Sequence, residues 1–231
     1  MNIKEAAERH NGYIVAQRRR FHAHPELSFE ERETTAAIRG ELEAMGIAVE
    51  TFPDYYGLIG TIEGGKPGAT VMLRADIDAL PSVEKTGLPF ASENEGKMHA
   101  CGHDAHISML LGAAKILSEM RDELSGTVKL LFQAAEESCH GAEYYVERGC
   151  LDGVGAIFGM HIWGTLDAPL MSLEPGGRMA SCDNFKITVR GRASVMSTLR
   201  MEDLTVTADF SRHYDAAAKQ VELEVALPLS S

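Results

Sequence analysis

Apolar and polar residues alternate along the first 190 positions in a way that predicts both helices and strands. In residues 30–45, Ile38, Leu42 and Met45 recur at spacings of four and three, which places them on one face of a helix that Gly46 would end. Helices are expected over residues 4–23, 30–45, 107–120 and 142–148. Strands are expected over residues 48–52, 58–63, 70–75, 127–132, 155–160, 170–173 and 180–189.

The order of these segments predicts an α/β fold. The largely apolar run at residues 70–75 is typical of a central strand, because such strands are buried on both faces. Strands and helices then alternate, which is the rhythm of a layered α/β domain. Polar residues follow the ends of the expected strands, and ligands bind at the carboxyl ends of strands in such sheets.

The composition is that of an ordinary globular protein, with 231 residues, 45% hydrophobic and 24% charged. The length suits one α/β domain, with or without a short appendage. A net charge of −12 argues against nucleic acid or an anionic membrane as a partner. No signal-like or membrane-spanning apolar segment is seen, so we expect a cytoplasmic protein whose four cysteines are thiols.

The most unusual segment is residues 98–106, which read Met-His-Ala-Cys-Gly-His-Asp-Ala-His. Packing thiol, imidazole and carboxylate groups this densely is unfavourable unless a cation compensates for the lost water. Cys101 and His103 could face one ion across a turn made by Gly102. A Cys-x-His pair alone is also common without metal, but the flanking Asp104 and His106 favour a metal site.

Further candidates follow two other strands. Glu136 and Glu137 come after an apolar run, and His161 comes after another. Adjacent residues in an extended chain point to opposite sides, so one carboxylate could bind metal while the other reaches the reacting water. Solvated carboxylates and a core histidine are the simpler alternatives. Asp76 and Asp78 could orient a ligand histidine or cap a turn.

Five blocks of the chain together resemble the M20 family of metallopeptidases, in its amidohydrolase branch. The branch includes hippurate hydrolases, N-acyl-amino-acid and N-acetyl-diaminopimelate deacylases, and auxin-conjugate hydrolases. The resemblance covers about residues 10–190. The blocks are Phe21-His-Ala-His-Pro-Glu-Leu-Ser-Phe-Glu-Glu31, Leu73-Arg-Ala-Asp-Ile-Asp-Ala-Leu-Pro81, Met98 to His106, Phe132-Gln-Ala-Ala-Glu-Glu137 and Phe158-Gly-Met-His161.

The resemblance implies a layered α/β/α catalytic domain of zinc-peptidase type that hydrolyses the amide bond of small N-acyl amino acids. It implies up to two divalent ions, bridged by Cys101, with Glu136 as general base and Asp78 as an orienting group. The metal ligands that it implies are Cys101, His103, Glu137 and His161. These ligand types admit zinc, manganese, cobalt or nickel.

The chain also departs from the family near Gly191. Family members are longer, with an inserted lid domain that dimerises and a further metal-ligand histidine late in the chain. We therefore interpret residues 1–190 as the N-terminal part of the catalytic domain and residues 191–231 as a divergent tail. The lid and the homodimer contact are expected to be absent, and one sheet edge to be exposed and apolar. The alternatives are a catalytically impaired remnant of such an enzyme, which binds metal without turnover, and a dipeptidase.

Overall fold

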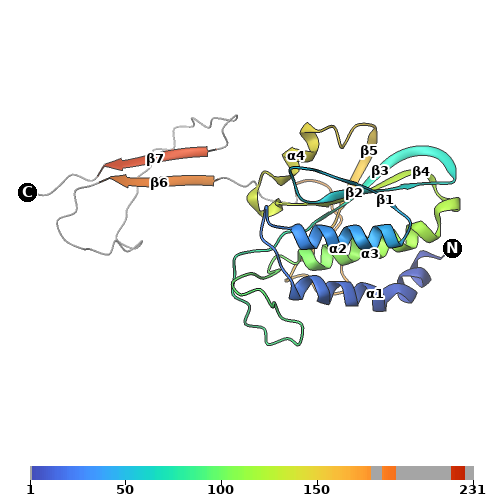
Figure 1. Cartoon of the computed structure of the whole chain (residues 1–231), viewed down its shortest axis with the longest axis horizontal. Helices are drawn as coiled ribbons and strands as arrows, with labels where there is room; N and C mark the ends of the chain where they lie inside the picture. Colours follow the sequence, from blue (N-terminus) through green and yellow to red (C-terminus); the bar gives the residue numbers. More distant parts are fainter. Residues whose placement is uncertain (1, 178–183, 191–219, 227–231) are drawn as a thin grey trace, which may run out of the picture. The chain divides into compact units, whose positions relative to one another are not determined.

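The structure, a computed structural model of the whole chain, describes residues 2–177, 184–190 and 220–226. It divides into two units, residues 1–171 and residues 172–231 (Figure 1). In the second unit, β6 (Asn184–Arg190) pairs in parallel with β7 (Gln220–Ala226). The strand expected over residues 180–189 is therefore observed as β6, and residues 178–183 lie outside the described part.

The first unit is a five-stranded sheet with helices on both faces. The strand order is β1-β2-β4-β3-β5. The strands are β1 (Ala48–Thr51), β2 (Leu58–Glu63), β3 (Lys66–Asp76), β4 (Ser125–Gln133) and β5 (Val154–Gly159). The helices are α1 (Ile3–Ala23), α2 (Arg32–Ala44), α3 (His103–Glu119), α4 (Gly141–Glu147) and the short 3₁₀ turns η1 (Arg121–Glu123) and η2 (Glu136–Ser138).

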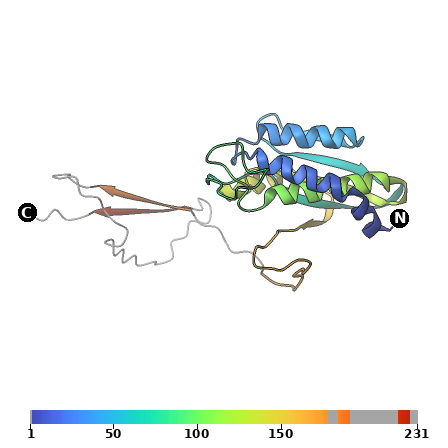
Figure 2. The same ribbon diagram turned by 90° about the horizontal axis from the view of Figure 1, so that it is seen from below.

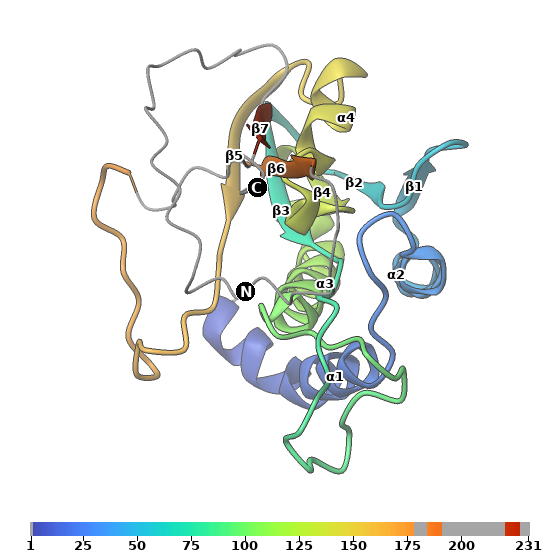
Figure 3. The same ribbon diagram turned by 90° about the vertical axis from the view of Figure 1, so that its left-hand side faces the viewer.

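Three helices cover one face of this sheet and one covers the other, so the predicted α/β/α layering is confirmed. Helices α1, α2 and α3 lie together on one face and α4 on the opposite face (Figures 1 and 3); Figure 2 views the molecule from the three-helix face. The larger core contains the predicted stripe residues Ile38 and Leu42, both fully buried. A smaller core on the other face joins Met72 and Leu131 of the sheet to Tyr145 of α4.

The functional edge of the sheet is the one where β3, β4 and β5 end. Strand β3 pairs in parallel with both β4 and β5, so it is the central strand that the apolar run predicted. The carboxyl ends of these three strands lie at one edge, where they deliver Asp76, Gln133 and Gly159. All the predicted site residues follow or lie close to these ends.

Strand β5 is the outer strand of the sheet and carries exposed apolar side chains. Ile157 is 50% and Phe158 60% exposed. An exposed apolar sheet edge was predicted, and β5 has both properties. The prediction of a strand over residues 170–173 is wrong. This segment has no regular structure, and the apolar Leu170 and Met171 are exposed. An apolar run alone does not make a strand when, among the described residues, no neighbour pairs with it.

Two further expectations concern cysteines and membranes. Cys101 and Cys150 are free thiols, but Cys139 is disulfide-bonded, so the prediction of a thiol is wrong there. No helix in the described part of the chain combines the length and the apolar character that a bilayer crossing requires.

Candidate metal centre

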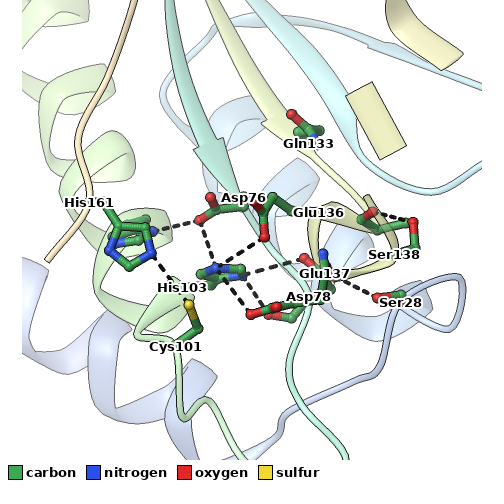
Figure 4. A network of polar contacts seen from close by, with 12 residues as sticks. Ser28, Asp76, Asp78, Cys101, His103, Gln133, Glu136, Glu137, Ser138 and His161 are labelled. Carbon is green, nitrogen blue, oxygen red and sulfur yellow. Dashed lines mark hydrogen bonds and ion pairs between the residues drawn. The ribbon is translucent and has the colours of Figure 1, made fainter. Parts of the chain in front are cut away.

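The predicted ligands converge at the carboxyl edge of the sheet, around the imidazole of His103. Figure 4 shows His103 with Asp76, Glu136, Glu137 and Asp78 on one side and Cys101 and His161 on the other. His103 comes from the first turn of α3, and its neighbours come from the ends of β3, β4 and β5 and from the loop before α3.

A tight turn places Cys101 next to His103. Gly102 adopts φ +90°, a left-handed conformation that L side chains rarely adopt. A Cβ atom at Gly102 would also lie 2.3 Å from Cδ1 of Ile162, so the side chain of Ile162 packs directly on this turn. The helix begins at His103 rather than at the expected residue 107, and the first ligand imidazole is therefore fixed by helical backbone.

Asp78 orients the His103 ring. Nδ1 of His103 donates a hydrogen bond to the backbone carbonyl of Asp78 at 2.9 Å and lies 3.4 Å from Oδ1 of the same residue. Nε2 therefore carries the lone pair and faces the cluster. It is buried and has no hydrogen-bond partner in the described part of the chain, and it lies 3.8 Å from Oε2 of Glu136 and 3.7 Å from Oε1 of Glu137.

The sequence suggested that Glu136 and Glu137 point to opposite sides of the chain, but in the structure they do not. Ala135 has φ +56°, which turns the chain out of β4, and Glu136 and Glu137 then lie in the 3₁₀ turn η2 rather than in an extended segment. Both carboxylates consequently approach Nε2 of His103. Oε1 of Glu137 is buried and has no hydrogen-bond partner among the described residues, whereas the side chain of Glu136 is 39% exposed.

His161 completes the cluster from the segment after β5. Its Nδ1 donates to the carbonyl oxygen of Ile162 at 2.5 Å, which leaves the lone pair on Nε2. That Nε2 lies 3.3 Å from Sγ of Cys101. The thiol and this imidazole are thus placed as neighbouring donors of one site.

Within the described part of the chain, three groups of side chains have donor atoms close enough together to hold a cation. They are Cys101 with His103 and His161, His103 with Glu136 and Glu137, and Asp76 with His103 and His106. Hydrogen bonds occupy the third group. His106 uses Nδ1 for Asp76 and accepts from the Ile162 amide at Nε2, and the other oxygen of Asp76 accepts from Arg74. The first two groups keep unpaired atoms and suit a metal better.

The electrostatics of the cluster also call for a cation. Burial, together with the hydrogen bond and charge of Glu137, raises the pKa of the Cys101 thiol to about 12, so thiolate does not form there without a compensating positive charge. Burial and the charge of Asp76 raise the pKa of Glu136. Burial alone would lower the pKa of His103, but the hydrogen bond with Asp78 and the charge of Asp76 raise it. A bound divalent ion would oppose these pKa shifts, because it would favour the thiolate, the carboxylates and the neutral imidazole.

Some supporting contacts were not anticipated from the sequence. Oδ2 of Asp78 accepts hydrogen bonds from Ser28 Oγ at 2.6 Å and from the Glu137 amide at 3.0 Å, so it joins the N-terminal segment to η2. Glu31, which is fully buried, accepts a hydrogen bond from the Ala135 amide at 2.7 Å. Both Ser28 and Glu31 lie in a sequence block that resembles the M20 family, but no local pattern indicates contacts with residues 50 and 104 positions away.

The chain is similar to known hydrolases over most of its described length. The profile of the peptidase family M20/M25/M40 matches residues 72–229. That match begins later and ends later than the motif resemblance, and the division at residue 190 stays a prediction.

Two curated relatives are bacterial enzymes. The N-acetylcysteine deacetylase of Bacillus subtilis is 47% identical over 180 residues, which are 78% of this chain and 47% of the relative. The N-acyl-L-amino acid amidohydrolase of Geobacillus stearothermophilus is 41% identical over 191 residues, 82% of this chain and 52% of the relative. The chain spans about half the length of the curated relatives it matches.

A solved structure shows the same fold. The YXEP protein of Bacillus subtilis, described as a dinuclear metal-binding peptidase from the M20 family, is 48% identical, with a TM-score of 0.65, over 71% of this chain and 45% of that one. Together with the profile match, this similarity shows that the chain belongs to the peptidase family M20/M25/M40.

Proposed function

We propose that this chain is part of a metal-dependent amidohydrolase that cleaves the amide bond of small N-acyl amino acids. The observation that carries the proposal is the pair of buried, unpaired donor atoms, Nε2 of His103 and Oε1 of Glu137, 3.7 Å apart beside the Cys101–His161 pair. Buried polar atoms normally have a hydrogen-bond partner. Two such atoms that face each other without one therefore indicate that a positively charged partner binds between them.

A divalent cation fits these donors. Cys101, His103, Glu137 and His161 would hold it, and the two donor groups that share His103 would suit a second ion. The dinuclear centre named for the Bacillus subtilis structure supports the second ion. When bound, the cation would make water more acidic and polarise the amide carbonyl. Zinc, manganese, cobalt and nickel all suit these ligand types.

Glu136 is the proton carrier of the proposed reaction. Its carboxylate is only half-buried, and its Oε2 lies 3.8 Å from Nε2 of His103, at the open side of the cluster. Its raised pKa suits a group that takes a proton from the attacking water and returns it to the leaving amine nitrogen. Asp78 keeps the ring of His103 turned toward the cluster.

The relatives support the proposed substrate class. Two of them are named N-acetylcysteine deacetylase and N-acyl-L-amino acid amidohydrolase, and we extend this class to the present chain. A cytoplasmic location stays a prediction.

Hydrolysis assays on the purified full chain test the proposal. With zinc or manganese added, N-acetyl-leucine or N-benzoyl-glycine should be hydrolysed, and Glu136→Gln should lower kcat by about 10²–10⁴ because general acid–base catalysis is worth that much. Glu147→Gln, an exposed change on α4, is the matched control and should leave the rate unchanged. Metal binding without turnover would support a remnant, and faster cleavage of Gly-Leu than of N-acetyl-leucine would support a dipeptidase.

A further inference from the structure

His106 is a buried histidine beside the candidate metal centre. It is not one of the four residues that we propose as metal ligands. It lies one turn after His103 on α3 and is 2% exposed. Its ring centroid is 5.3 Å from that of His103 and 4.7 Å from that of His161, so it packs between the two ligand imidazoles.

Hydrogen bonds fix the tautomer of His106. The amide N–H of Ile162 donates to Nε2 at 3.0 Å, so Nε2 must carry a lone pair. The proton is then on Nδ1, which donates to Oδ1 of Asp76 at 2.5 Å. Arg74 donates to the other oxygen of Asp76 at 2.8 Å, so this carboxylate is held at both ends.

The amide that His106 holds belongs to the peptide unit that joins His161 to Ile162. The carbonyl oxygen of the same Ile162 accepts from Nδ1 of His161, and the Ile162 side chain packs on Gly102 in the turn between Cys101 and His103. One residue, Ile162, therefore links the segment after β5 to the thiol-bearing turn. No regular secondary structure holds that segment, since β5 ends at Gly159.

We propose that His106, oriented by Asp76, is a positioning residue that holds His161 beside Cys101 through the backbone of Ile162. The proposal rests on the proposed metal-dependent function, because its consequence is an affinity for metal. It assigns the Asp76–His106 pair a role outside the ligand set. The imidazole of His106 accepts one hydrogen bond from a backbone amide. The carboxylate of Asp76 keeps the imidazole in the tautomer that can accept this bond.

Two substitutions separate the two hydrogen bonds of His106. Gln places an amide oxygen near the position of Nε2, so His106→Gln should still accept from Ile162. Asn reaches only the position of Nδ1, so His106→Asn can bond Asp76 but not Ile162. Ser108→Ala is the matched control on α3, because the buried Ser108 hydroxyl bonds only Ala105 of its own helix.

The first measurement is calorimetric titration of the full chain with Zn²⁺. His106→Asn should weaken Zn²⁺ binding about 10- to 100-fold, as loss of an outer partner of a metal ligand does, whereas His106→Gln and Ser108→Ala should bind within about twofold of the unchanged chain. In a His161→Ala background, His106→Asn should cause no further loss, because its effect passes through His161. An equal loss in both backgrounds, or no loss in either, would overturn the proposal.

The second measurement needs no metal. Hydrogen exchange of the Ile162 amide, followed by NMR in the metal-free chain, should be slow in the unchanged chain and in His106→Gln but fast in His106→Asn. The same rate in all three would overturn the role of His106 even if Zn²⁺ binds. Protection with this pattern in a chain that binds no Zn²⁺ would support the His106 contact and would reject the proposed metal-dependent function instead.

Discussion

At the candidate metal centre, the hydrogen bonds of each histidine decide which of its ring nitrogens can bind a cation. Nδ1 of His103 and Nδ1 of His161 each donate to a backbone carbonyl, which leaves both Nε2 atoms free to act as donors to a cation. His106 has no nitrogen left over. The difference between ligand and supporting histidine is thus decided by the second hydrogen bond of each ring, which no spacing rule in the sequence reports.

Glu31 offers a test at the scale of one residue. Its side chain is fully buried; Oε1 accepts from the Ala135 amide and Oε2 has no hydrogen-bond partner. Burial raises the pKa of Glu31 from its ordinary value of 4.5 to about 7. Because the folded state holds this proton more tightly, the stabilising contribution is complete below pH 4.5 and is lost as the pH rises through 7.

Glu31→Gln should remove that pH dependence. The Gln oxygen can still accept from Ala135, so the variant should gain stability relative to the unchanged chain as the pH rises from 4 to 8, by about 3 kcal/mol for a shift of this size. Urea unfolding at both pH values measures the gap. A gap that is the same at pH 4 and pH 8 would show that Glu31 is not a buried, proton-binding group.

At the scale of elements, the turn before α3 decides where two of the ligands lie. It passes from Cys101 into a helix that starts at His103, and Gly102 makes this change of direction in a left-handed conformation. The turn also receives the side chain of Ile162. A side chain at residue 102 would therefore disturb both the backbone and the packing.

Gly102→Ala should destabilise the fold by at least about 1–2 kcal/mol, the cost of a left-handed L residue, and should weaken Zn²⁺ binding because the Ile162 contact must shift. Gly12→Ala on α1 is the control, since a Cβ there meets nothing within 4 Å. It should instead stabilise the helix by about 0.5–1 kcal/mol. Urea unfolding gives the stabilities and calorimetry the affinities. Equal effects of the two changes would contradict the special role of the turn.

Most elements could be predicted from the sequence because apolar periodicity reports which face is buried. Ile38 and Leu42 mark the buried face of α2, and the expected strand over residues 58–63 is β2 without adjustment. The failures lie where single backbone angles decide. Ala135 turns Glu136 and Glu137 into η2, and Gly102 lets α3 begin four residues early; hydrophobic pattern carries no signal for either.

At the scale of the whole molecule, the centre depends on topology. Parallel pairing of β3 with β4 and β5 gathers three strand ends at one edge, so Asp76 and His161 both come close to His103 despite their separation along the chain. That convergence could be anticipated from the polar residues after each strand. The contacts of Glu31 with Ala135 and of His106 with Ile162 could not, because they depend on the packed positions of whole elements.

The central claim is that a thiolate from Cys101 shares a divalent cation with the imidazoles and carboxylate around it. Titrating the full chain with Co²⁺ tests this claim most directly, because a thiolate bound to Co²⁺ gives an intense near-ultraviolet charge-transfer band. The account predicts a saturable band that is lost in Cys101→Ser and retained in Cys150→Ser, the matched change at the other free thiol of the described residues. No band, or a band that persists in Cys101→Ser, would contradict it.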